Sequence, residues 1–211
     1  MKIPLETFFK PKSIAVVGAS KNPEKIGHAS LKNILISDYP CKLYPVNPNE
    51  EEILGLKCYK QLTDIPHAVD LVMIAIPEPL VLQIIKDCVK KKVKWVIIIT
   101  SGFSEIGNHD GEEAIKKLVQ GTGIRILGPN TMGYKNASDN LDVSFVFGMP
   151  RKGNLALISQ SGALGMGMIY LANNEFVGLS KIIGVGNKLD IDDDDLVDYF
   201  SQDPETKVIG L

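Results

Sequence analysis

A run of small residues between Gly18 and Gly27 follows directly on the apolar segment Ser13–Val17. A strand that ends in a glycine turn and leads into a helix directs backbone N–H groups, and the positive end of the helix dipole, toward one point. That point suits a phosphate or pyrophosphate group. The glycine spacing is not G-x-G-x-x-G, so the dinucleotide fingerprint is absent. A plain tight turn between a strand and a helix is the alternative.

A second motif of this kind, SQSGAL at residues 159–164, joins an apolar run to a helical pattern. Two hydroxyl groups and the free N–H groups of a helix start predict a second anion site. The alternative is that Ser161 only caps the helix. A serine-hydrolase elbow is disfavoured, because G-x-S-x-G requires a glycine where Ser159 stands.

Both motifs need a scaffold, and the hydrophobic pattern predicts one. Apolar runs of strand length alternate with helical windows, and the runs are continuously apolar, which indicates a parallel sheet covered on both faces. We therefore predict an α/β fold with a Rossmann-like, doubly wound parallel sheet. Strands are expected at Ser13–Val17, Lys42–Val46, Asp70–Ile76, Lys94–Thr100 and Arg125–Leu127, and helices at Ile26–Ser37, Leu80–Lys92 and Gly111–Gly121.

Small or polar loops follow all five predicted strands. Ligands bind beyond the carboxyl ends of the strands in such sheets, so these loops are expected to form one site. A dinucleotide site places an acid after the second strand to bind the ribose diol, but Asn47 stands there. We therefore expect an adenine nucleotide with phosphate groups and not NAD. The loops are 18–21, 47–49, Pro77, 101–105 and 128–130.

The alternation breaks down at Asn136–Met149, where we expect a turn and an extended ribbon at Leu141–Phe147, followed by a linker at Pro150–Asn154. The alternation of strands and helices then resumes, and the sequence ends on an apolar run that is expected to be a strand. We expect a first domain at residues 1–149 and an incomplete second α/β domain at residues 150–211. The second is expected to have strands at Leu155–Ile158, Lys181–Val185 and Lys207–Leu211 and helices at Ala163–Asn173 and Asp192–Ser201.

Composition disfavours several classes of protein. The net charge of −2 leaves no basic excess to neutralise nucleic-acid phosphates, and the apolar runs are too short to cross a membrane. Three cysteines without a C-x-x-C pair indicate neither a zinc site nor a disulfide framework, and they fit a cytoplasmic protein.

The sequence predicts neither a metal site nor a catalytic histidine. The acidic run Asp190–Asp195 lacks the glycine and the closing glutamate of an EF-hand, so we expect it to stabilise a helix start. The histidines, at 28, 67 and 109, have no acid or cysteine at ligand spacing; only His28, beside the phosphate loop, is near enough to contact a ligand.

Eight segments, in their order and spacing, resemble the α-subunit side of nucleoside-diphosphate-forming acyl-CoA synthetases, the group that contains ADP-forming acetyl-CoA synthetase and succinyl-CoA synthetase. The NPN loop and the SGFSE motif fit the ADP-forming branch better. The resemblance implies a Rossmann-like CoA-binding domain followed by a flavodoxin-like domain. The segments are SIAVVGASKNPEKIG, YPVNPNEEEILGLKCY, LVMIAIP, IIITSGFSEIG, ILGPNTMG, LALISQSGALG, IIGVGNKLDID and DPETKVI.

The resemblance also implies site residues. The CoA phosphates would be surrounded by Gly18, Ala19, Ser20, Lys21 and Gly27. The nucleotide would be flanked by Val46, Asn47 and Pro48, and the adenine or pantetheine by Ile76 and Pro77. The pantetheine path would follow Ser101, Gly102, Phe103 and Glu105 toward a thiol near Asn130. The phosphate of the family's phosphohistidine would be held by Ser159, Ser161 and Gly162.

Two departures follow from the same comparison. The succinyl branch has a lysine after the second strand where this chain has Asn49 and Glu50, so the neutralisation of the CoA phosphates is open. No histidine here matches the phosphorylated one, which is expected beyond Leu211, so this chain is expected to hold no catalytic residue. ATP, ADP and Mg²⁺ would bind only through an ATP-grasp domain or β subunit.

The expected function is therefore the CoA-binding portion of an oligomeric acid–thiol ligase. The whole enzyme would interconvert acyl-CoA, ADP and phosphate with acid, ATP and CoA through an acyl phosphate and a phosphohistidine. The alternative is a CoA- or nucleotide-binding regulatory module, as in acetyltransferase-fused CoA-binding domains. A nicotinamide-linked redox sensor is disfavoured by Asn47.

Overall fold

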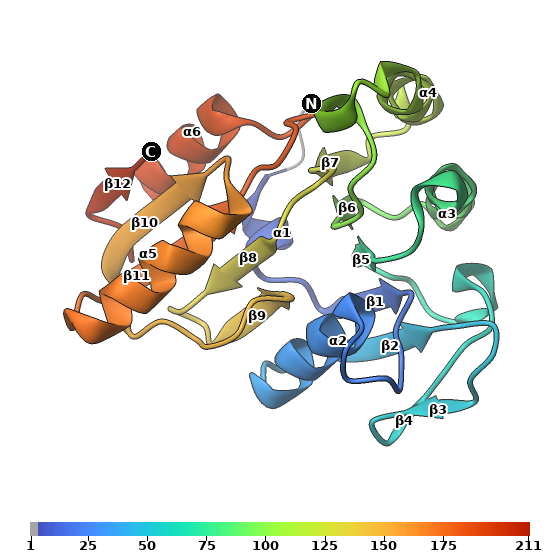
Figure 1. Ribbon diagram of the computed structural model, residues 1–211, viewed down its shortest axis with the longest axis horizontal. Coiled ribbons are helices and arrows are strands. Elements are labelled where there is room, and N and C mark those ends of the chain that lie inside the picture. The colour runs from blue at the N-terminus through green and yellow to red at the C-terminus, as the bar shows by residue number, and fades with distance from the viewer. Residues whose placement is uncertain (1–3) are drawn as a thin grey trace.

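The computed structural model describes residues 4–211 and places them in two five-stranded sheets and one small hairpin (Figure 1). The first sheet has the order β2-β1-β5-β6-β7, with every pairing parallel. The predicted doubly wound sheet is thus confirmed, and its order reverses between β1 and β5, where such sheets bind ligands. Its strands are β1 (Ser13–Val17), β2 (Lys42–Val46), β5 (Leu71–Ile74), β6 (Trp95–Ile98) and β7 (Arg125–Leu127).

Helices cover both faces of the first sheet, because its strands are apolar on both sides. α2 (Ile26–Ile36) packs on the face that carries Val16. α3 (Glu78–Lys91) and α4 (His109–Val119) pack on the opposite face, which carries Val17. Neighbouring residues of one strand therefore enter two separate cores, which is why the runs are continuously apolar.

The second sheet is mixed, with the order β12-β10-β11-β8-β9. β11 and β12 both pair parallel to β10. β8 pairs antiparallel to β11, and β9 pairs antiparallel to β8. α5 (Gly162–Asn174) and α6 (Asp193–Gln202) pack on its opposite faces. The strands are β8 (Gly133–Asn136), β9 (Leu141–Ser144), β10 (Lys152–Ser159), β11 (Leu179–Gly184) and β12 (Val208–Gly210).

Some expected boundaries are wrong. The segment Pro150–Asn154 is not a linker throughout, because β10 already begins at Lys152. α3 begins at Glu78 and not at Leu80, since a proline is tolerated in the first turn of a helix. Short elements that were not predicted are α1 (Glu6–Phe9), the hairpin β3 (Glu52–Ile53) and β4 (Leu56–Lys57), the strand β8 (Gly133–Asn136), and the 3₁₀ turns η1 (Leu62–Asp64) and η2 (Ser104–Ile106).

The hairpin β8–β9 lies within the predicted first domain, residues 1–149, yet its hydrogen bonds join it to β11 of the second sheet. The hairpin region also contacts α2, the helix that covers one face of the first sheet. The Asn33 side chain on α2 donates to the carbonyl groups of Ser144 and Val146, each at 3.0 Å. The boundary after residue 149 remains a prediction, and the hairpin connects the two sheets.

A further connection runs along the outer edge of β7. The amides of Leu189 and Ile191 donate to the carbonyl groups of Gly128 and Ile126, so this segment is hydrogen-bonded to the edge of the first sheet without being a strand of it. Arg125 adds ion pairs to Asp190 and Asp195 at 2.8 and 2.5 Å. Within residues 4–211, no helix combines the length and apolar character needed to cross a bilayer.

Candidate functional site

The turn between β1 and α2 is packed so closely that only glycine fits at its two ends. Gly18 has φ +90°, and a Cβ atom there would lie 2.2 Å from the carbonyl oxygen of Ala75. A Cβ atom on Gly27 would lie 1.8 Å from the carbonyl oxygen of Gly18. The first helical turn of α2 therefore packs directly against Gly18, at the end of β1. Within the described part of the chain, no side chain caps the N-terminus of α2. Unpaired N–H groups at a helix start favour the binding of an anion.

A cavity of about 670 Å³ opens in front of this helix start, between the ends of β1, β5 and β6. It lies where the strand order reverses, in agreement with the expected place of the site. Of the predicted site residues, it is lined by Gly18, Ser20, Gly27, Asn47, Ile76, Pro77 and Ser101. Lys25, Glu78 and Thr100 also line it and were not predicted.

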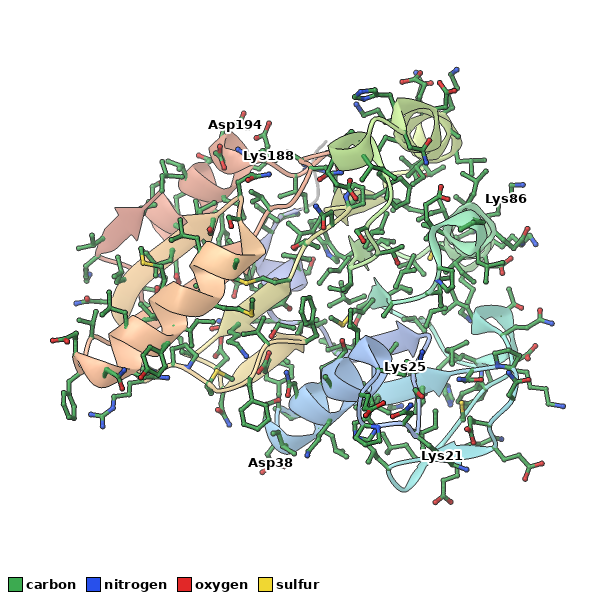
Figure 2. All side chains as sticks on the ribbon, viewed as in Figure 1. Lys21, Lys25, Asp38, Lys86, Lys188 and Asp194 are labelled. Atoms are coloured by element: carbon green, nitrogen blue, oxygen red, sulfur yellow. The ribbon has the colours of Figure 1, made fainter. Side chains whose placement is uncertain are left out.

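Lys25, not Lys21, is the cation at this cavity. Lys21 forms an ion pair with Glu50 at 2.7 Å, and that hydrogen bond raises the pKa of Lys21. Figure 2 shows both lysines on the loop before α2, and Lys86 on the outer side of α3. Lys25 immediately precedes α2. Its position next to a predicted helix start is the sequence signal that identifies it.

Asn47 holds the loop between β1 and α2 in place. Its amide group donates to the carbonyl oxygen of Ala19 at 2.7 Å, across the gap between β1 and β2. The Ala19 side chain is fully buried, so only its backbone can face a ligand. His28 contacts the loop as well, through Nδ1 and the carbonyl oxygen of Ser20 at 2.9 Å. The position of the usual ribose-binding acid is thus occupied by a structural amide.

A second groove, of about 610 Å³, adjoins the first and shares Gly18, Asn47 and Ile76 with it. It brings together the predicted residues Val46, Asn47 and Pro48 from the end of β2. Lys60 and Gln61, from the segment before η1, form another part of its wall and were not predicted. The groove is also lined by Lys90, which forms an ion pair with Asp87 at 3.2 Å, so Lys60 and Lys90 are both cations at this sheet edge.

The loop after β6 is held by Glu105. Its carboxylate accepts hydrogen bonds from the amides of Gly102 and Phe103, and from Asn187 Nδ2 at 2.6 Å. Burial acts to raise the pKa of Glu105, but these hydrogen bonds outweigh it and the pKa is lowered. Phe103 is almost fully buried and belongs to the core. Glu105 and Phe103 thus position the loop, and Ser101 faces the cavity.

We expect Glu105 to make stability depend on acid pH. Because its folded pKa is lowered, its contribution is complete above the ordinary pKa of about 4.3 and is lost as the pH falls through the lower value. The thermal unfolding midpoint of Glu105→Gln, followed from about pH 6 to about pH 3, should therefore fall less steeply than that of the unmodified protein. Glu113→Gln on the exposed side of α4 is the control and should keep the original slope. Parallel curves for Glu105→Gln and the unmodified protein would contradict this role.

A third cavity, of about 480 Å³, lies between the two sheets and shares Ile26, Ile99 and Ser101 with the first. It contains the predicted residues Asn130, Ser161 and Gly162. Ser161 caps α5, since its hydroxyl accepts from the Leu164 amide at 3.2 Å. Ser159 donates to the Ser161 carbonyl oxygen at 2.9 Å and so supports the cap. Gly162 and Ala163, the first two residues of α5, line this cavity, and N–H groups at a helix start have no partner within the helix.

The acidic run has structural partners. Asp192 caps α6 by accepting from the Asp194 amide, and Asp195 pairs with Arg125. The carboxylates of Asp192, Asp194 and Asp195 lie within 4.8 Å of one another. Hydrogen bonding to Asp194, together with burial, raises the pKa of Asp192. The expected role in stabilising a helix start is present in the structure.

Comparison with known protein families agrees with this arrangement. Residues 12–137 match a family described as a CoA binding domain, and residues 152–211 match the succinyl-CoA ligase like flavodoxin domain. The chain belongs to the family of CoA-binding domains, and a match to a flavodoxin-like domain follows.

Individual relatives point to ADP-forming enzymes. The chain is 43% identical over 201 residues to the ADP-forming acetate–CoA ligase of Methanocaldococcus jannaschii. It is 45% identical to the α subunit of the ADP-forming acetate–CoA ligase II of Pyrococcus furiosus. These matches cover 95% and 98% of the chain but only 28% and 45% of the relatives.

A solved structure agrees over the same range. The dinucleotide-forming acetyl-coenzyme A synthetase 1 of Ca. Korarchaeum cryptofilum, determined with phosphate and ADP, superposes with a TM-score of 0.94 at 47% identity. The match covers 97% of this chain and 44% of that one. The predicted resemblance to the α side of ADP-forming acyl-CoA synthetases is confirmed, and the chain spans less than half the length of these relatives.

Proposed function

We propose that this chain binds coenzyme A along the edge of the first sheet and serves as the CoA-binding part of an ADP-forming acyl-CoA synthetase. The observation that carries the proposal is the continuity of three cavities. The groove at β2, the cavity at the start of α2 and the cavity before α5 each share lining residues with the next. A long ligand with an adenine nucleotide at one end and a reactive thiol at the other suits such a trough.

Each part of CoA would have its own neighbours. The nucleotide lies in the groove beside Val46 and Pro48, and the diphosphate lies at the start of α2, near Lys25. The pantetheine passes Ser101 toward Asn130, so its thiol faces the start of α5. Lys25 and Lys60 would neutralise phosphate charge in place of the lysine found after the second strand in the succinyl branch.

In the whole enzyme, the CoA thiol would attack the acyl carbon of an acyl phosphate and displace inorganic phosphate, giving acyl-CoA. That acyl phosphate would form in the preceding step, when a phosphohistidine outside this chain transfers the phosphate it received from ATP to the acid. The amides at the start of α5, next to Ser161, would stabilise the negative charge of that phosphate. An ATP-grasp domain or β subunit would bind ATP, ADP and Mg²⁺. The family assignment and the α5 geometry support this sequence of steps, and the cytoplasm and an oligomeric state are part of the same proposal.

Calorimetric titration of the chain with CoA tests the proposal. We expect one binding site, and Lys25→Gln should weaken it about ten- to 150-fold, because a charge-assisted hydrogen bond to phosphate is worth about 1.5–3 kcal/mol. Lys86→Gln, which removes an exposed lysine on the outer side of α3, should leave the affinity unchanged. Absence of binding, or enhancement of NADH fluorescence instead, would contradict the proposal.

A further inference from the structure

The cavity between the two sheets has apolar walls and one polar end. Ile26 and Ile99 form the wall on the side of the first sheet, and Met132, Phe145 and Met166 form the opposite wall. The polar end is made by Asn130, Gln160 and Ser161, and Ser101 and Thr131 add two more hydroxyl groups to the lining. Among residues 4–211, none that lines this cavity carries a charged side chain. Such a lining suits a ligand with a short apolar body and a single polar group.

We propose that this cavity holds the acyl group and that Phe145 and Met166 set the size it accepts. This inference rests on the proposed function, because the acyl group must be joined to the thiol of CoA. The cavity shares Ile26, Ile99 and Ser101 with the cavity at the start of α2, so a pantetheine arm leaving the latter enters the former. The thioester oxygen would then face the polar end, and the acyl carbon chain would contact the apolar wall.

Two of the wall residues are held in fixed positions. Met132 lies between two glycines: a Cβ atom on Gly165 would be 2.8 Å from its Cε, and one on Gly184 would be 2.7 Å from its Cγ. Phe145 follows Ser144 and precedes Val146, and both of their carbonyl groups accept hydrogen bonds from the Asn33 side chain. The backbone that carries Phe145 is therefore fixed on both sides of the ring.

Met166 is the adjustable part of the wall. Its side chain is 42% exposed, and it lies on the first turns of α5, one turn after the polar end. A methionine side chain rearranges easily, so it can follow the shape of a small acyl group. The rigid Phe145 ring, by contrast, blocks longer or branched groups.

The same lining disfavours a dicarboxylic acyl group. A second carboxylate at the far end of the acyl chain would be placed against Ile99 and Phe145, and no lining residue within 4–211 is a cation that could pair with it. Burial of an unpaired carboxylate is costly. Succinyl-CoA should therefore bind less tightly than butyryl-CoA, which has the same number of carbon atoms.

The experiment is calorimetric titration of this chain with CoA, acetyl-CoA, butyryl-CoA, phenylacetyl-CoA and succinyl-CoA. In Phe145→Ala and in Met166→Ala, the affinity for phenylacetyl-CoA relative to acetyl-CoA should rise about tenfold. Each substitution removes a large side chain from the cavity wall and so leaves room for a larger acyl group. CoA itself should bind as before. Thermal unfolding shows whether Phe145→Ala remains folded, and Met166→Ala, at a more exposed position, tests the same wall independently.

Two matched controls separate the cavity from its surroundings. Phe147→Ala removes a ring that is 90% exposed two residues from Phe145, and Met168→Ala removes an exposed methionine two residues from Met166. Neither residue lines the cavity, so both variants should keep the original preference. An unchanged preference in Phe145→Ala and Met166→Ala, with normal CoA binding, would overturn the acyl-pocket proposal alone. Loss of CoA binding in the unmodified chain would overturn the proposed function and this inference with it.

Discussion

Gly27→Ala should weaken CoA binding about a hundredfold, although it adds only one methyl group. The Cβ atom would lie 1.8 Å from the Gly18 carbonyl oxygen, which is backbone and cannot rotate away. The start of α2 must therefore move outward by an ångström or more, and the amides that face the phosphates move with it. Displacements of about 1 Å at a binding site cost about 10²-fold in related cases. Titration with CoA measures the loss.

Gly167→Ala is the matched control, because Gly167 is also a helical glycine but has open space around its Cβ position. Alanine is the better helix former, so this variant should be more stable by about 0.5–1 kcal/mol and should bind CoA normally. Gly55→Ala separates backbone strain from crowding, since Gly55 has φ +79° and no close neighbour. It should lower stability slightly and leave binding intact. Normal CoA binding by Gly27→Ala would contradict the close-packed turn.

Lys135→Met should destabilise the protein by about 3–5 kcal/mol, because it leaves a buried carboxylate without its partner. Lys135 forms an ion pair with Asp142, and their side chains are only 1% and 7% exposed. Lys135 also donates to the Val146 carbonyl oxygen at 2.8 Å, and Ser144 donates to Asp142 at 2.7 Å. Burial lowers the pKa of Lys135 and raises that of Asp142, so both charges are retained only because they face each other. Urea unfolding measures the change.

The double variant Lys135→Met with Asp142→Leu should recover most of this loss, since apolar side chains of similar volume commonly replace a buried ion pair without cost. Lys117→Met removes a lysine from an exposed pair with Glu113, in which both side chains are more than half exposed. Exposed pairs contribute little, so this control should change stability by less than about 1 kcal/mol. A loss of similar size in Lys117→Met and Lys135→Met would contradict the role of burial.

The buried pair also matters for the site. It lies in the hairpin β8–β9, which connects α2 with the second sheet through Asn33 and carries Phe145 at its end. Lys135→Met is therefore expected to alter acyl-CoA preference as well as stability, whereas the destabilised protein should still bind the nucleotide end of CoA.

Much of the first sheet was predictable because its strands are short, continuously apolar and followed by glycine or polar loops. β1, β2 and β7 begin and end where the sequence predicts, and the start of α2 at Ile26 follows from the loop before it. The hairpin β8–β9 was not predictable as part of the second sheet. Its polar residues, Lys135 and Asp142, are buried only because they pair across the hairpin.

The amino-acid sequence by itself determined the fold class, the loops that meet at one sheet edge and the two glycines of the phosphate turn. These depend on local hydrophobic pattern and on backbone conformation, which neighbouring residues control. Only the tertiary structure decided that Lys21 pairs with Glu50 while Lys25 faces the cavity. Only it decided that Glu105 supports a loop, and that Phe145 and Met166 close a cavity between the sheets. These are contacts between distant segments, and their partners depend on how the two sheets pack and not on spacing along the chain.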